Sequence, residues 1–223
     1  MNKKMFIICS IFALIISCKN DVNGKDLETS EQKSLEISKQ IEQEIKKEFN
    51  GLLNILETKD LSTLDTSEIE KTIKDLKDKV DKSDAKTTSL KTYSEYEEKV
   101  KEIKEKLKGK GNFEDKLKGL EDSLKKKRDD RRKALEEARQ TFQGYKGQVD
   151  TATGETQGHR AQNQRGSGAQ AWTKAREYGL SVSYSNGSGT DTSDMSSGII
   201  DEAIKQIDEE LKNNGEEAEG VKK

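Results

Sequence analysis

The sequence predicts a mainly α-helical, elongated protein whose helices pack as hairpins or as a coiled-coil-like bundle. The composition gives the first indication: of 223 residues, 38% are charged and 30% hydrophobic, and the mean hydropathy is −1.01. So little apolar surface cannot support a large globular core, which leaves disorder or long amphipathic helices. Apolar residues recur at spacings of three and four over most of the chain, and this periodicity favours helices.

The segment 1–17 predicts a lipoprotein signal peptide. Two lysines precede an apolar run of about 12 residues, which is too short to span a bilayer. The run ends in IISC, the pattern of a bacterial lipobox, and the sequence then turns polar. Cleavage after Ser17 would leave Cys18 first in the mature chain, carrying acyl chains such as palmitate that anchor it to a membrane. An ordinary secretory signal that contains Cys18 is the alternative interpretation.

The mature chain would keep Cys18 as its single cysteine, because Cys9 lies in the removed segment. It therefore has no disulfide to form and no thiol for chemistry. Residues 18–28 are polar and are expected to form an acylated, flexible tether. Residues 29–149 are expected to form the helical region.

Four helices are predicted in this region. The first runs from about Thr29 to Leu56. The second runs from about Thr66 to Asp81, and Asp65, three residues before Glu68, is its start signal.

The third predicted helix has capping-box spacing at Thr92 and Glu95, and ends at the GKG of residues 109–111. The fourth, from Phe113 to Val149, is the longest and would span about 55 Å.

The C-terminal part changes in character. Residues 150–198 are rich in glycine, serine and threonine and are expected to be irregular, with a short helix near 169–178. The stretch LSVSY that follows fits a short strand or an extended segment. An amphipathic helix is predicted at 199–212, and an acidic, frayed tail at 213–223.

Nothing in the sequence assembles a catalytic or metal site. His159 is the single histidine and lies in a glycine-rich stretch without a cysteine partner, and no phosphate-binding or dinucleotide motif occurs. We therefore expect no enzymatic activity, no cofactor and no metal. Trp172, the single tryptophan, either forms an aromatic contact in a binding loop or anchors the C-terminal region on the helices, and the second interpretation is favoured.

Charge is segregated along the chain. Residues 99–133 hold 15 basic and 8 acidic side chains, although the protein as a whole has a net charge of −2. Inside this block the run KKKRDDRRK interrupts the apolar stripe of the long helix between Leu124 and Leu135. We expect the run to lie beyond the paired section of the third and fourth helices, exposed on most sides. Its cations are Lys125, Lys126, Lys127, Arg128, Arg131, Arg132 and Lys133.

Two interpretations of this run stay open. Opposite charges four residues apart, as at Lys125 and Asp129, are typical of a solvated helix face. Like charges at the same spacing, as at Lys127 and Arg131, oppose the helix and favour a site for a polyanion. Outside a cell that polyanion would be a sulfated glycosaminoglycan such as heparan sulfate rather than a nucleic acid.

Several blocks closely resemble the OspE/OspF-related (Erp) surface lipoproteins of Lyme disease spirochetes, especially the OspF-like branch. The likeness covers essentially the whole chain, and its most specific parts are FQGYKGQVDTATGETQGHRAQNQ, GAQAW and GLSVSYSNGSGTD. The resemblance implies a lipid-anchored protein of the outer membrane, exposed on the cell surface and engaged in host interaction and virulence.

The resemblance also bears on the ligand. Members similar to OspF are associated with binding heparan sulfate, which supports a heparin-binding adhesin. The OspE-like branch is associated with complement factor H, so capture of plasma proteins for immune evasion is the alternative. Plasminogen is a second candidate for such capture, through the terminal Lys222 and Lys223. Helix packing also allows a homo-oligomer.

Overall fold

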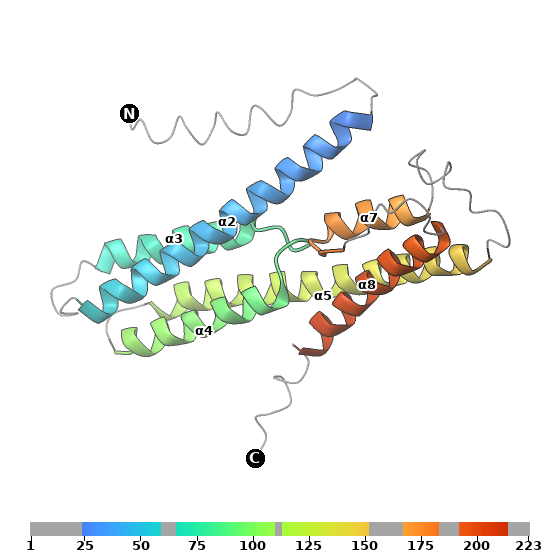
Figure 1. Cartoon of the computed structure of the whole chain (residues 1–223). Coiled ribbons are helices and arrows are strands. Elements are labelled where there is room, and N and C mark those ends of the chain that lie inside the picture. Colours follow the sequence, from blue (N-terminus) through green and yellow to red (C-terminus); the bar gives the residue numbers. More distant parts are fainter. Residues whose placement is uncertain (1–23, 59–65, 110–112, 152–166, 183–191, 214–223) are drawn as a thin grey trace, which may run out of the picture. The chain divides into compact units, whose positions relative to one another are not determined.

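The computed structural model describes residues 24–58, 66–109, 113–151, 167–182 and 192–213 (Figure 1). The chain divides into two units, Met1–Lys33 and Ser34–Lys223, and the packing below belongs to the second. The described residues form six helices and no strand, which confirms the predicted mainly α fold. The helices are α2 (Gly24–Thr58), α3 (Thr66–Lys82), α4 (Leu90–Leu107), α5 (Glu114–Thr151), α7 (Ser167–Glu177) and α8 (Thr192–Asn213).

The predicted long fourth helix is α5, which has 38 residues. Two boundaries differ from prediction. Helix α2 begins at Gly24, inside the segment assigned to the tether, and α8 begins at Thr192, inside the segment expected to be irregular. Residues Leu180–Val182 form no strand, and the rest of LSVSY lies outside the described residues. So do Asp65, Gly111 and the tail from 214 onward.

Helix α4 begins earlier than its capping-box spacing predicted. Ser89 has extended backbone angles, and its side chain accepts a hydrogen bond from the Thr92 N–H at 3.1 Å. A serine hydroxyl at this position satisfies one of the free N–H groups of the first turn. The N-cap is therefore Ser89, and Thr92 lies inside the helix with its hydroxyl 3.0 Å from that of Ser89.

A first apolar core joins α2, α3, α4 and the N-terminal half of α5. Most of the apolar stripe predicted for each of these helices is buried in it, and Phe49 of α2 stacks on Tyr96 of α4 with ring centroids 5.4 Å apart. The Tyr96 hydroxyl donates to the Glu42 carbonyl at 3.1 Å. Burial raises the pKa of Tyr96 above its ordinary value, because the charged form would lose its hydration.

A second apolar core joins the C-terminal half of α5 to α7 and α8. Leu135, Ala138 and Phe142 of α5 are buried there, together with residues of α7 and α8. Leu90, the first residue of α4, also belongs to this core. Trp172 is half-buried against it, which agrees with an anchoring role for the tryptophan. Helix α5 is thus common to both cores (Figure 1).

Helix α7 ends in a Schellman motif. Leu180 donates its N–H to the Ala175 carbonyl at 2.9 Å, and Gly179 donates to Arg176 at 3.0 Å. Gly179 has φ +68°, where glycine is favoured, and a Cβ there would lie 3.0 Å from the Thr87 carbonyl oxygen. The motif therefore fixes the end of α7 against the connection between α3 and α4.

Arg131 of α5 lies between the two cores and is 2% exposed. Its guanidinium donates to both carboxylate oxygens of Glu210 on α8, at 3.0 and 2.8 Å. It also donates to the Tyr178 carbonyl at 2.9 Å and to the Lys86 carbonyl. Glu210 accepts a further hydrogen bond, at 2.8 Å, from the N–H of Leu90. One ion pair therefore joins α5 and α8, the start of α4, the end of α7 and the connection after α3.

Replacing Arg131 by Met should lower the free energy of unfolding by about 3 kcal/mol, because Glu210, whose side chain is 16% exposed, would keep a mostly buried charge without its partner. Urea unfolding measures this. Lys133→Met, at an exposed site two residues away, is the matched control and should change stability by less than about 0.5 kcal/mol. Equal stabilities of the two variants would contradict the assigned role of Arg131.

Two glycines should respond in opposite directions to alanine. Gly179→Ala should destabilise by more than about 1 kcal/mol, because it strains a positive φ and crowds the Thr87 carbonyl. Gly144→Ala, within α5 and with no atom within 4 Å of the new Cβ, should stabilise by about 0.5–1 kcal/mol. Thermal unfolding monitored by circular dichroism separates the two, and a stabilised Gly179→Ala variant would contradict the motif.

Candidate functional site

The predicted exposure of the basic run is wrong for four of its seven cations, and three of these four contact neighbouring elements. Arg131 is buried, as described above. Lys127 donates from Nζ to the Ser83 carbonyl at 2.5 Å, and Arg128 pairs with Glu97 of α4 at 2.7 Å. Packing therefore explains much of this run's composition, because these cations occupy the places where the apolar stripe is interrupted and bind groups of neighbouring elements.

The geometry also corrects the predicted end of the paired section. Arg128 of α5 pairs with Glu97 of α4, and seven residues away on each helix Glu121 pairs with Lys104 at 3.0 Å. This antiparallel register places the start of α4, Leu90, level with about residue 135 of α5. The whole run thus lies alongside α4 rather than beyond it.

The other four cations of the run differ in their surroundings. Lys125, Lys126 and Lys133 are exposed, and Arg132 is half-buried. Lys126 and Lys133 lie on the outer crest of α5, where helical spacing places Asp122 four residues before Lys126, and Asp129 four residues before Lys133. This crest has alternating charge and offers a polyanion no net attraction.

The seam between α4 and α5 presents a more cationic surface. Residues at spacings of three and four form one row on each helix, and the two ion pairs above align the rows. From one end to the other, the positions that lie level are Ser94 and Arg132, Glu97 and Arg128, Lys101 and Lys125, Lys104 and Glu121, and Lys108 and Lys118. We call these ten residues the α4–α5 strip.

The α4–α5 strip contains seven cations and two carboxylates along about 21 Å of helix. Both carboxylates are engaged in the two aligning ion pairs. Lys101 and Lys125 lie level with each other, as do Lys108 and Lys118, and all four are exposed, with no side-chain ion pair in the described part of the chain. Glu98 and Glu105 border the strip on α4, so the excess of positive charge is confined to the seam.

This arrangement is chemically suited to a linear polyanion. Two lysines at one level repel each other, and an anion between them relieves that repulsion. The two lysine pairs are seven residues apart, or about 10 Å along the helices, so successive charged groups of one extended chain can meet them in turn. Sequence reasoning missed Lys101, Lys104, Lys108 and Lys118, because their alignment with the run depends on the register of α4 against α5.

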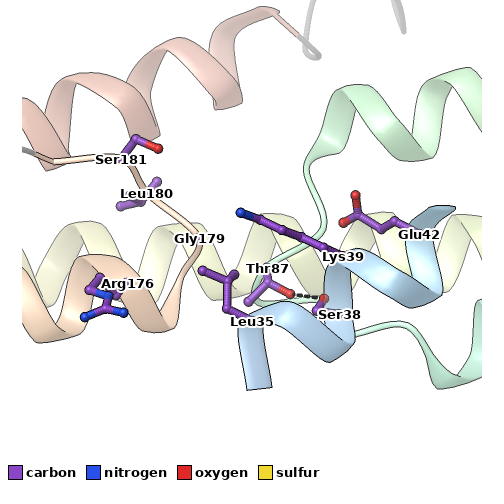
Figure 2. A pocket seen from close by; sticks show the side chains of 9 residues that line it. All are labelled: Leu35, Ser38, Lys39, Glu42, Thr87, Arg176, Gly179, Leu180 and Ser181. Carbon is purple, nitrogen blue, oxygen red and sulfur yellow. Dashed lines mark hydrogen bonds between the residues drawn. The ribbon is translucent and has the colours of Figure 1, made fainter. Parts of the chain in front are cut away.

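A hollow of about 190 Å³ lies on α2, beside the α3–α4 connection and the end of α7 (Figure 2). Its floor includes a hydrogen bond of 2.6 Å between the hydroxyls of Ser38 and Thr87. Two cations and one carboxylate line it, together with two leucines. The lining residues are Leu35, Ser38, Lys39, Glu42, Thr87, Arg176, Gly179, Leu180 and Ser181.

Several residues singled out in the sequence lie outside the described residues. They are Ser17, Cys18, His159, Lys222 and Lys223. Lipidation at Cys18 and plasminogen capture at the terminal lysines therefore stay predictions. Across the described ranges, no cluster of His, Cys, Asp or Glu side chains suits a metal ion. None of the helices described there combines the length and apolar character needed to cross a membrane.

The fold and the strip thus define a helical bundle with a cationic seam. No family model, curated protein or solved structure matches this chain.

Proposed function

We propose that this protein is a lipid-anchored adhesin of the outer cell surface that binds sulfated glycosaminoglycans along the α4–α5 strip. The observation that carries the proposal is the alignment of Lys101 with Lys125 and of Lys108 with Lys118, without carboxylate partners for these four lysines in the described structure. Lysine and arginine attract sulfate through charge-assisted hydrogen bonds. The protein acts by binding and performs no catalysis.

The proposed location rests on the sequence before the bundle. The IISC pattern at Cys18 supports acylation, and the resemblance to Erp lipoproteins supports an outer-membrane anchor exposed to host tissue. At a cell surface, sulfated polysaccharides are the abundant linear polyanions. Their repeated charges match a seam of cations better than a single small anion would.

Heparin binding should depend on the seam rather than on the crest. Lys101→Gln/Lys125→Gln should elute from immobilised heparin at clearly lower salt than the unaltered chain. By analogy with counterion release at nucleic acid backbones, its log–log salt slope should fall by roughly 2. Lys126→Gln/Lys133→Gln removes the same charge from the crest and should have a smaller effect.

Two outcomes of this comparison would count against the proposal. Equal losses in the two double variants would show that net charge, rather than the strip, determines retention. No retention of the unaltered chain at physiological salt would contradict glycosaminoglycan binding as the function. A pull-down from serum, done in parallel, would then decide whether capture of a plasma protein takes its place.

The anchor has its own test. In a bacterial host with lipoprotein processing, the chain should incorporate labelled palmitate and partition into the detergent phase. Cys18→Ala should abolish both, because the acylated thiol is lost. Labelling that persists in Cys18→Ala would contradict acylation at this cysteine, whatever the outcome of the heparin experiment.

A further inference from the structure

The hollow on α2 combines apolar walls with an excess of positive charge. Leu35 of α2 and Leu180, which follows α7, contribute the apolar part. Figure 2 shows the Lys39 side chain extending from α2 toward the Gly179–Ser181 segment, with Arg176 on the α7 side and Glu42 at the far side. Two cations and one carboxylate therefore leave the hollow with one unmatched positive charge.

Both cations are available to a ligand. Neither Lys39 nor Arg176 has a carboxylate partner within the described residues. The Arg176 guanidinium lies over the Trp172 ring, 4.6 Å from its centroid, and this cation–π contact holds it in place. The Schellman motif at Gly179 and its close approach to Thr87 hold the neighbouring wall in place.

Charge and size together restrict the ligand. A ligand with one negative charge neutralises the unmatched positive charge of the hollow, whereas a dianion such as phosphate would leave an excess negative charge beside Glu42. An engineered apolar cavity of about 150 Å³ is known to accept benzene, so a space of about 190 Å³ can take a six-membered ring with a small substituent. Leucine walls favour an apolar ring over a sugar or a polar amino acid.

We propose that this hollow is a binding site for a small aromatic or branched aliphatic monocarboxylate. The carboxylate lies between Lys39 and Arg176, and the apolar body lies against Leu35 and Leu180. Because the hollow opens to solvent and the ligand is small, the affinity is modest, with a Kd on the order of 1 mM for a benzoate-sized ligand. This site uses none of the residues of the α4–α5 strip, so it stands independently of the glycosaminoglycan proposal.

The test is a titration of the isotope-labelled chain from Lys19 onward, which contains all of the described helices, with benzoate at constant ionic strength. The amide signals of Gly179 and Ser181 should shift and saturate. Benzyl alcohol, which has the same ring without the charge, should produce no saturable shift. Lys39→Gln and Arg176→Gln should each weaken benzoate binding by about tenfold, the expected loss of a charge-assisted hydrogen bond.

Lys47→Gln is the matched control, because Lys47 is an exposed lysine of α2 that does not line the hollow, and benzoate binding should be unchanged in it. Lys39 is itself exposed, so its substitution leaves the fold intact and keeps the test informative if Arg176→Gln loses helical structure. The proposal is overturned if no saturable shift appears or if benzyl alcohol binds as tightly as benzoate. It is also overturned if the unaltered chain and the Lys39→Gln variant bind benzoate with equal affinity.

Discussion

The ion pair between Arg131 and Glu210 is the interaction on which the rest of this structure depends. A buried charge is costly unless its partner and its remaining hydrogen-bonding groups are satisfied, and here they are. Arg131 binds the carboxylate of Glu210 and the carbonyl oxygen of Tyr178, at the C-terminal end of α7 where the helix dipole is negative. Glu210 in turn accepts from the N–H of Leu90, at the positive N-terminal end of α4. Each charge thus complements a helix end as well as its partner.

The ion pair and its hydrogen bonds also affect which side chains lie together on the surface. Because Glu210 and Ser89 together fix the start of α4, and Arg128 pairs with Glu97, α4 lies against α5 in one register. That register brings lysines of two sequence segments level with each other along the seam. The cations inside the bundle and those on its surface therefore have different roles within one run of sequence. The former join helices, whereas the latter are available to an anionic ligand.

Periodicity was enough to predict the helices, their order and the long α5, because each apolar stripe is a local property of the chain. It was not enough for Arg131. An arginine at a position of the apolar stripe is ordinarily exposed, and its burial depends on Glu210, 79 residues later in α8. The alignment of Lys101 with Lys125 could not be predicted from the sequence either, because it depends on a register set by tertiary contacts. The early start of α8 at Thr192 was missed because serine, glycine and aspartate there favour loops in isolation. Isoleucines buried in the second core, Ile199 and Ile200, stabilise the helix that follows.

Native-state hydrogen exchange tests the central claim, that one ion pair couples the two cores. In the unaltered chain, the most protected amides of both cores should open with the same free energy, because each core depends on the other through this ion pair. These are the amides of α3 and α4 in the first core and of α7 and α8 in the second. In Arg131→Met the amides of α7 and α8 should lose protection first, while those around Phe49 and Tyr96 keep most of theirs. Two distinct opening free energies already present in the unaltered chain would contradict the coupling.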